Sequence, residues 1–176
     1  MNRFTLMATN SDKWEELVFL SLGSNLGNRL KNLERARKAI NKCVGKIELV
    51  SSLYKTQAWG KENLNSFCNQ VIGVSTNLFA NKVLEYCQEI ELELGRLPKK
   101  SSGYENRLID IDLLIYGKQV LETNKLELPH PRMHLRNFVL VPFAEIAPEI
   151  QHPALNQSIE NLKNNCLDCN KIERME

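Results

Sequence analysis

The hydrophobic and polar positions alternate most regularly between residues 106 and 117. In an extended strand, every second side chain from 109 to 115 is apolar and points to one face. Asp110 and Asp112 point to the other face, roughly 6–7 Å apart along the chain. Two like charges on an otherwise apolar strand repel each other and resist burial unless a cation lies between them. Mg²⁺, which prefers oxygen ligands, satisfies both carboxylates; the alternative is an edge strand with a solvated acidic face.

The remaining apolar patterns predict the other elements. Short apolar or alternating runs predict three more strands, at residues 17–22, 47–56 and 67–78. Helical spacing predicts four helices, which run between Asn28 and Gly45, over 80–94, over 136–146 and over 158–165. Asn28 is placed to cap the first helix, and Gly45 and Gly95 end the two long ones. Pro142 lies inside the third helix, where it is expected to kink or restart it.

This order of elements predicts an α+β fold. A ferredoxin-like βαββαβ core places both long helices on one face of a mostly antiparallel sheet, and a C-terminal elaboration follows. We expect a flexible N-terminal extension over residues 1–14, a single domain over 15–165 and a polar tail over 166–176. The architecture alone does not indicate a function.

Length and charge narrow the classes of protein. The chain has 176 residues, a size typical of one globular domain, and a net charge of only +2. No clustered basic excess favours nucleic acid or an anionic membrane, and no apolar run is long enough to span a bilayer or to serve as a secretory signal. We therefore expect a cytoplasmic monomer that acts on small molecules.

The cysteines favour a reducing compartment. There are five of them, an odd number scattered through helical and strand patterns, which predicts reduced thiols. Cys166 and Cys169 form a C-x-x-C pair in the polar tail. Because a zinc site needs a second pair or histidines, and a redox site needs a thioredoxin-like setting, neither role is favoured.

Basic residues precede the acidic strand. The chain contains no P-loop, and the glycines at 23 and 27 lack the dinucleotide-binding spacing. Arg96, Lys99, Lys100 and Arg107 instead bracket a loop rich in small residues, which is typical of an active-site lid. Cations close to paired carboxylates indicate a polyphosphate bound with Mg²⁺.

Several residues indicate a flat ligand. Trp59, Phe67 and Phe138 offer aromatic surfaces, although core packing is the alternative for the two phenylalanines. Asn69, an amide on a predicted strand, suits the polar edge of a heterocycle because it both donates and accepts hydrogen bonds. His130, held between two prolines, either meets a phosphate or supports its loop.

Taken together, the motifs resemble those of one family, the 6-hydroxymethyl-7,8-dihydropterin pyrophosphokinases of folate biosynthesis. The resemblance runs from about Leu17 to about Pro153. The motifs that carry it are Leu22-Gly23-Ser24-Asn25-Leu26-Gly27, Tyr54-x-Thr56-x-x-Trp59-Gly60, Phe67-x-Asn69, Glu91-x-x-x-Gly95-Arg96, Arg107-Leu108-Ile109-Asp110-Ile111-Asp112, Leu128-Pro129-His130-Pro131 and Arg136-x-Phe138.

The resemblance implies an ATP-dependent diphosphokinase. Such an enzyme transfers the β,γ-pyrophosphoryl group of ATP to the pterin hydroxymethyl oxygen and releases AMP. The resemblance also implies two Mg²⁺ ions on Asp110 and Asp112, with Arg96 and Arg107 acting on the phosphates during catalysis. The residues implied on the ATP side are Glu91, Arg96, Lys99, Lys100, Tyr104, Arg107, His130 and Arg136. Those implied on the pterin side are Thr56, Gln57, Ala58, Trp59, Gly60, Phe67, Asn69, Asp110 and Phe138.

The sequence departs from the family pattern in the lid. Tyr104 stands where tryptophan is common, and the loop is one residue longer than in some members, which leaves open whether Lys99 or Lys100 matches the family's lysine. Phe67 stands where tyrosine is also found.

Two other functions share parts of this pattern. A palm-like nucleotidyltransferase also builds two-metal sites on ferredoxin-like sheets, but it releases pyrophosphate and usually needs a further carboxylate on a neighbouring strand. A nucleic-acid-binding module needs aromatic residues on a basic sheet face, which residues 71–74 do not supply.

Overall fold

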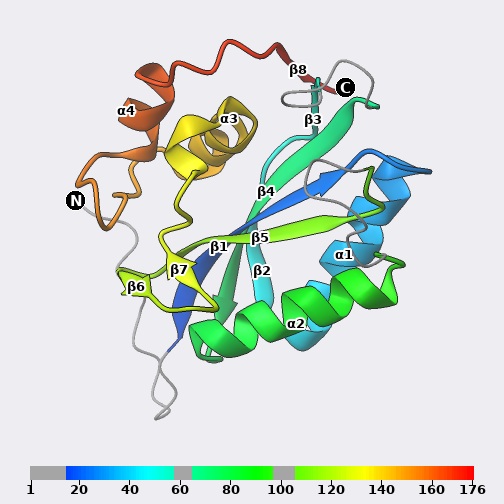
Figure 1. Cartoon of the computed structure of the whole chain (residues 1–176), viewed down its shortest axis with the longest axis horizontal. Coiled ribbons are helices and arrows are strands. Elements are labelled where there is room, and N and C mark those ends of the chain that lie inside the picture. The colour runs from blue at the N-terminus through cyan, green and yellow to red at the C-terminus, as the bar shows by residue number, and fades with distance from the viewer. Residues whose placement is uncertain (1–14, 58–64, 97–105) are drawn as a thin grey trace.

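The structure is a computed structural model that describes residues 15–57, 65–96 and 106–176 (Figure 1). Its strands are β1 (Glu16–Ser24), β2 (Lys46–Val50), β3 (Tyr54–Thr56), β4 (Phe67–Thr76), β5 (Asp110–Tyr116), β6 (Leu121–Glu122), β7 (Glu127–Leu128) and β8 (Ile172–Arg174). Its helices are α1 (Arg29–Cys43), α2 (Ala80–Glu93), the 3₁₀ turn η1 (Met133–Leu135), α3 (Asn137–Ile146) and α4 (Ile159–Asn164).

A six-stranded antiparallel sheet forms the centre of the molecule. Its order is β5-β1-β4-β3-β8, and β2 also pairs with β4, while β6 and β7 form a separate small hairpin. Helices α1 and α2 cover one face, and α3 and α4 lie on the other (Figure 1). The predicted α+β class is confirmed, with both long helices on one face. None of the helices in the described ranges has the length and apolar content that a membrane crossing requires.

Alternate residues of the central strands lie in two apolar cores, one on each face of the sheet. Leu20 and Leu22 of β1 are buried in the core under α1 and α2. Phe19, which precedes Leu20, points to the other face, where the centre of its ring lies 4.4 Å from that of Phe143 in α3. The sheet is therefore buried on both sides over part of its length, which explains the nearly continuous apolar run of β1.

The strand β5 departs from simple alternation. Its register against β1 shifts between Phe19 and Leu20, so that Leu114 and Ile115 both point to the α3 side and Tyr116 returns to the α2 side. The prediction that alternate residues from 109 to 115 share one face is therefore right as far as Leu113 and wrong at Ile115. A bulge inserts one unpaired residue, which reverses every side chain beyond it.

The predicted strand over residues 47–56 is interrupted. It forms two short strands, β2 and β3, that both pair with β4. Between them, the Ser51 hydroxyl accepts a hydrogen bond from the Val71 amide at 3.0 Å, and its carbonyl accepts one from the Gln70 side chain at 2.7 Å. Together with the backbone bond from the Ser51 amide to the Val71 carbonyl at 2.9 Å, these side-chain bonds hold the segment between the two short strands against β4.

The helix ends follow the signals in the sequence. The Asn28 side chain accepts a hydrogen bond from the Lys31 amide at 3.1 Å and caps α1. Gly95 ends α2 with φ +95°, a backbone conformation that favours glycine. Helix α3 continues through Pro142, and Ser158 caps α4. The strand β8, which lies in the polar C-terminal tail, was not predicted.

Candidate active site

A cleft opens on the α3 side of the sheet, beyond the end of the apolar core. It encloses about 590 Å³, part of it open to solvent. Its lining comes from β1, β3, β4, β5 and the start of α3. The residues that line it are Ser21, Gly23, Thr56, Gln57, Phe67, Asn69, Arg107, Asp110, Asp112, Arg136 and Phe138.

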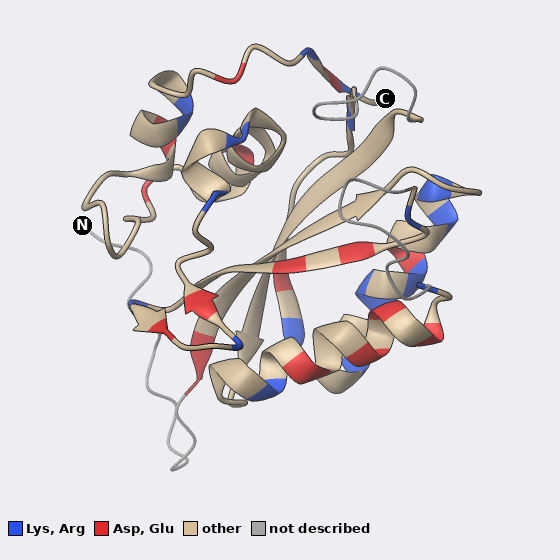
Figure 2. Cartoon of the chain, in the orientation of Figure 1, with Lys and Arg blue, Asp and Glu red and all other residues tan. Residues whose placement is uncertain are grey.

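The sheet register places the two aspartates at the floor of this cleft. Asp110 lies opposite Gly23, and Asp112 lies opposite Ser21, on the neighbouring strand β1. They form the two acidic segments of β5 in the middle of Figure 2. A Cβ atom at Gly23 would lie 3.0 Å from Oδ1 of Asn69 on β4, so the absent side chain keeps open the space between β5 and β4.

Two arginines form ion pairs with Asp110, the first residue of β5. Nη1 of Arg107 lies 2.5 Å from Oδ1 of Asp110, and Nη1 of Arg96 lies 3.2 Å from the same oxygen. Arg96 also forms an ion pair with Glu91 of α2. The second oxygen of Glu91 accepts a hydrogen bond from the Ile111 amide at 2.7 Å, which ties α2 to the acidic strand.

The surroundings of Asp112 and Glu91 disfavour the charged form of their carboxylates. Burial and the neighbouring charge of Asp110 raise the pKa of Asp112 to about 6, although Arg136 and Arg107 oppose the rise. The same two causes, burial and Asp110, raise the pKa of Glu91 to about 7, against Arg96. A cation between Asp110 and Asp112 would remove this repulsion.

The donor set suits a hard cation that shares its ligands with a substrate. In the described ranges, no group of three or more His, Cys, Asp or Glu is arranged to hold a metal ion. The two aspartates offer only oxygen atoms. Mg²⁺ commonly binds through one or two carboxylates together with substrate phosphates, and the pair on β5 fits this mode.

Asn25, which follows β1, fixes the approach to the acidic strand. Its Oδ1 accepts a hydrogen bond from the Arg107 amide at 2.6 Å, and its own amide donates to the Arg107 carbonyl at 3.1 Å. Its side-chain nitrogen donates to Oδ1 of Asn106 at 2.8 Å. Because Asn25 is buried, these bonds fix the backbone position of Arg107 ahead of β5.

The other end of the cleft is apolar and aromatic. Phe67 of β4 and Phe138 of α3 both line it, and the guanidinium carbon of Arg136 lies 5.5 Å from the centre of the Phe138 ring. The side-chain nitrogen of Asn69 donates to the Thr56 hydroxyl at 2.7 Å. This bond orients the amide, with its Oδ1 beside Gly23.

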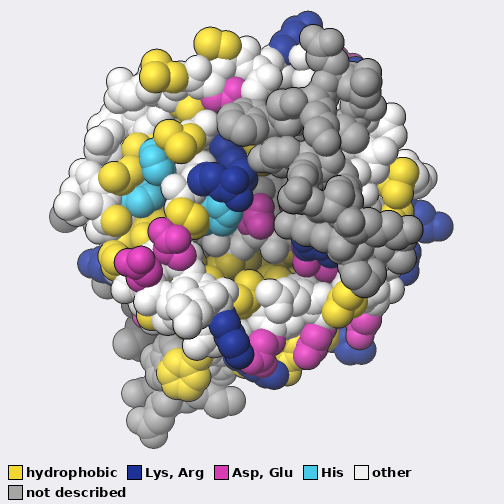
Figure 3. Space-filling view, in the orientation of Figure 1, with side chains coloured by type: hydrophobic (Ala, Val, Ile, Leu, Met, Phe, Trp, Pro, Cys, Tyr) yellow, Lys and Arg dark blue, Asp and Glu magenta, His cyan; other side chains and the backbone are white. Residues whose placement is uncertain are grey.

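His130 lies outside this cleft. It lines a different depression together with His134 and His152, and the space-filling view shows histidine side chains gathered on this face beside basic ones (Figure 3). Burial, with the charges of Arg136 and Arg132, lowers the pKa of His130 to about 4, so its ring is neutral at pH 7.

The structure brings most of the predicted pterin-side residues together with the aspartates. Glu91 and Arg96 do not line the cleft themselves. Arg96 forms ion pairs with Glu91 and with Asp110, which does line it. The predictions for Ala58, Trp59, Gly60, Lys99, Lys100 and Tyr104 lie outside the described residues. Sequence reasoning missed Ser21 and Gly23 as lining residues. A signal for them was present in the sequence. They are two small residues, two positions apart, in the apolar run that forms β1.

Comparison with known proteins shows the class to which the chain is similar. Relatives named as 2-amino-4-hydroxy-6-hydroxymethyldihydropteridine pyrophosphokinase include a Porphyromonas gingivalis protein, 40% identical over 139 residues, which cover 78% of this chain and 94% of that protein. An Aquifex aeolicus protein of the same name is 35% identical over 146 residues, 83% of this chain and 89% of that protein. A Dictyostelium discoideum folic acid synthesis protein matches 90% of this chain, at 35% identity, but only 24% of its own length is covered.

The model of the 7,8-dihydro-6-hydroxymethylpterin-pyrophosphokinase (HPPK) family matches residues 19–148, and the chain belongs to this family. It is thus an ATP-dependent pyrophosphokinase of folate biosynthesis, as the resemblance predicted. Among solved structures, a Plasmodium falciparum HPPK-DHPS protein matches with a TM-score of 0.72 at 17% identity. This likeness covers 88% of the chain but only 44% of the longer Plasmodium chain, and it supports the fold alone.

Proposed function

We propose that this cleft transfers the β,γ-pyrophosphoryl group of ATP to the hydroxymethyl oxygen of 6-hydroxymethyl-7,8-dihydropterin and releases AMP. The observation that carries the proposal is the meeting of three features in one cleft. These are the carboxylates of Asp110 and Asp112, the arginines that reach Asp110, and the aromatic pocket formed by Phe67 and Phe138. A charged and an apolar subsite side by side suit one polyphosphate and one flat heterocycle.

Asp110 and Asp112 are the residues that would hold Mg²⁺, as two ions in the family pattern. Bound there, the metal would neutralise triphosphate charge and make the β-phosphorus open to in-line attack. The raised pKa of Asp112 is consistent with this role, because burial beside Asp110 leaves the pair in need of a cation.

Arg96 and Arg107 are proposed to bind the phosphate oxygens. Both guanidinium groups already form ion pairs with Asp110. When a polyphosphate binds, its oxygens compete with the carboxylate for these donors, so the arginines exchange one anionic partner for another. Their charges then hold the nucleotide where the pterin oxygen attacks.

The pterin is proposed to lie between Phe67 and Phe138, which line the cleft from β4 and from α3. Asn69 would contact the polar edge of the ring, because its nitrogen is already bound to Thr56 and its oxygen lies towards Gly23. Gln57 lines the same wall. The roles of Ala58, Trp59 and Gly60 on this side stay predictions.

The rest of the ATP side also stays a prediction. Glu91, His130 and Arg136 are assigned to it, together with Lys99, Lys100 and Tyr104 of the loop. Glu91 supports the assignment through its ion pair with Arg96, and Arg136 through its place in the cleft lining. A cytoplasmic location and a monomeric state are likewise proposed, without nucleic acid or membrane as partners.

Incubation with MgATP and hydroxymethyldihydropterin tests this function. We expect AMP and the pterin diphosphate in equal amounts, separated and measured by ion-exchange chromatography. Omission of the pterin, and the Asp112→Asn variant, are the controls, and both should give little AMP. Release of pyrophosphate or of ADP in place of AMP would contradict the proposed reaction.

A further inference from the structure

The C-terminal residues 166–175, termed here the C-terminal strap, connect two parts of the molecule that form the cleft. The strap leaves α4, passes α3 and ends beside β3 (Figure 1). There β8 pairs with β3, with Ile172 opposite Thr56 and Arg174 opposite Tyr54. The Met175 amide continues the pairing by donating to the Leu53 carbonyl at 2.8 Å.

The first attachment of the strap is to the start of α3. Oδ2 of Asp168 accepts a hydrogen bond from the Asn137 amide at 2.9 Å, and the Asn137 side chain donates to the Asp168 carbonyl. The residue at the N-cap position, Arg136, makes no side-chain capping bond, so Asp168 supplies the cap from a distant segment. Asn137 stands between Arg136 and Phe138, which both line the cleft.

Asp168 is itself held in place. Its other oxygen, Oδ1, accepts hydrogen bonds from the Asn170 amide at 3.1 Å and from the Asn170 side chain at 2.6 Å. Both oxygens of the carboxylate are therefore engaged, one with α3 and one with the strap. This arrangement transmits the position of the strap to the first turn of α3.

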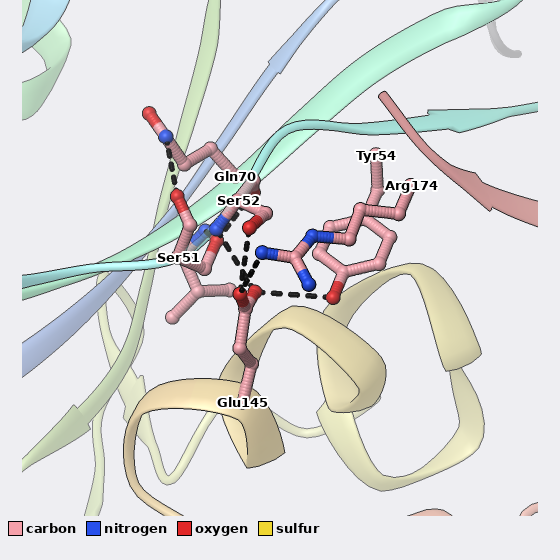
Figure 4. A network of polar contacts seen from close by, with 7 residues as sticks. Ser51, Ser52, Tyr54, Gln70, Glu145 and Arg174 are labelled. Carbon is pink, nitrogen blue, oxygen red and sulfur yellow. Dashed lines mark hydrogen bonds and ion pairs between the residues drawn. The ribbon is translucent and has the colours of Figure 1, made fainter. Parts of the chain in front are cut away.

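The second attachment centres on Glu145 at the other end of α3 (Figure 4). Its Oε2 accepts hydrogen bonds from the Ser52 amide at 2.9 Å and from the Tyr54 hydroxyl at 3.0 Å, and its Oε1 accepts one from the Ser52 hydroxyl at 2.6 Å. Nη2 of Arg174, on the strap, lies 3.4 Å from Oε1. Burial favours a higher pKa for Glu145, but the bonds from Ser52 and Tyr54 and the charge of Arg174 outweigh it and lower the pKa, so the carboxylate stays charged.

These two attachments join two walls of the cleft that come from different elements. One wall begins at α3, with Arg136 and Phe138, and the other is β3 and its continuation, with Thr56 and Gln57. Because hydrogen bonds fix direction as well as distance, both ends of α3 are held in register with β3. Apolar packing under α3 alone does not specify this register.

We propose that the C-terminal strap and Glu145 form a positioning element that sets the separation of the two cleft walls, and thereby the affinity for the pterin. The residues act through Phe138 and Thr56 and do not contact the ligand themselves. This inference rests on the proposed function, which assigns the pterin to this cleft. It adds that the C-terminal residues contribute to pterin affinity without contacting the pterin.

Four full-length variants test the proposal. Asp168→Ala removes the cap of α3, while Asp168→Asn keeps one acceptor oxygen and serves as the conservative variant. Tyr54→Phe removes one hydroxyl from Glu145 and leaves the core volume almost unchanged. Glu160→Gln is the matched control, because the Glu160 side chain bonds to Lys163 and Asn164 of its own helix, α4.

Calorimetry and steady-state kinetics give the deciding comparison. In Asp168→Ala and Tyr54→Phe, we expect the Kd and KM for the pterin to rise about threefold to tenfold, the size of effect that one lost hydrogen bond produces. The Kd for a nonhydrolysable ATP analogue should change less than about twofold, and kcat less than KM. Asp168→Asn should recover much of the pterin affinity, and Glu160→Gln should match the parent chain.

Two results would overturn the proposal. Equal losses of pterin and nucleotide affinity would indicate a general loss of structure, and a lower Tm with unchanged pterin affinity would indicate stabilisation only.

Hydrogen exchange separates this inference from the proposed function, since it needs no ligand. Asp168→Ala should speed exchange of amides in both walls, over residues 52–57 and 137–140. Faster exchange confined to the strap would contradict the inference. If the parent chain binds no pterin, the proposed function fails, and the exchange result alone decides whether the strap positions the walls.

Discussion

The two faces of β1 lie in different environments although they belong to one strand. Leu20 and Leu22 point into a wholly apolar core under α1 and α2. On the opposite face, Phe19 lies in the core under α3, but Ser21 and Gly23 line the cleft. One face is therefore apolar at Val18, Leu20 and Leu22 and contributes to stability, while the other changes from packing at Phe19 to the cleft at Ser21 and Gly23.

The difference shows how the protein combines a stable fold with a charged site. The covered face requires only apolar residues in register. The open face places Asp110 and Asp112 on the neighbouring strand, where burial and mutual repulsion oppose ionisation. The site is maintained because the sheet is stabilised from the other side. Changes on the two faces should thus have separate effects.

The largest effect is expected on the open face. Asp110→Ala or Asp112→Ala should reduce kcat by about three orders of magnitude or more, since each would remove an oxygen ligand of the proposed metal site. The unfolding transition should remain cooperative, as circular dichroism will show. Activity near that of the parent chain in either variant would remove the metal assignment.

On the covered face, the opposite result is expected. Leu20→Ala leaves a cavity in the core and should lower the free energy of unfolding by about 2–5 kcal/mol. Urea unfolding measures this loss, while KM for both substrates, determined at a temperature where the variant is folded, should stay close to that of the parent chain. A change in KM comparable to that of a cleft variant would break the distinction between the faces.

A smaller effect is expected where the strand meets the cleft. Gly23→Ala adds a methyl group 3.0 Å from Oδ1 of Asn69 and should weaken pterin binding about tenfold by displacing that amide. The nucleotide analogue should bind almost as before, which calorimetry with each ligand will test. If both ligands bound more weakly to the same extent, the effect of the methyl group would not be specific to the pterin side of the cleft.

The effect that is smallest at neutral pH concerns His130, because it develops only in acid. The folded state lowers the pKa of His130 from 6.5 to about 4, so below pH 6.5 the unfolded chain binds a proton that the folded chain does not. The stability from this residue is complete above pH 6.5 and is lost as the pH falls towards 4, with a slope of at most about 1.4 kcal/mol per pH unit. His130→Asn should flatten this part of the pH profile of unfolding. An unchanged slope would show that other groups cause it.

Much of this architecture could be predicted from the sequence, because local patterns determine it. Asn28 and Gly95 bound the long helices where they were expected. The alternation around Asp110 and Asp112 indicated a strand with an acidic face, and the family resemblance identified its chemistry. These features depend on residues near one another in the chain.

The parts that could not be predicted depend on distant partners. The bulge in β5 arises from its register against β1, and no local signal at Ile115 marks it. The strand β8 has three residues and no clear periodicity, and it forms because β3 offers an unpaired edge. The role of Glu145 likewise requires Ser52, Tyr54 and Arg174 to meet in space.

The central claim is that Asp110 and Asp112 hold the metal ions that bind the triphosphate, and counting bound ions tests it most directly. Mn²⁺ can replace Mg²⁺ and be followed by electron paramagnetic resonance, in the presence of a nonhydrolysable ATP analogue. We expect two ions per chain in the parent protein. In the Asp110→Ala, Asp112→Ala double variant we expect only the ion that the nucleotide carries weakly by itself. Two tightly held ions in that variant would contradict the claim.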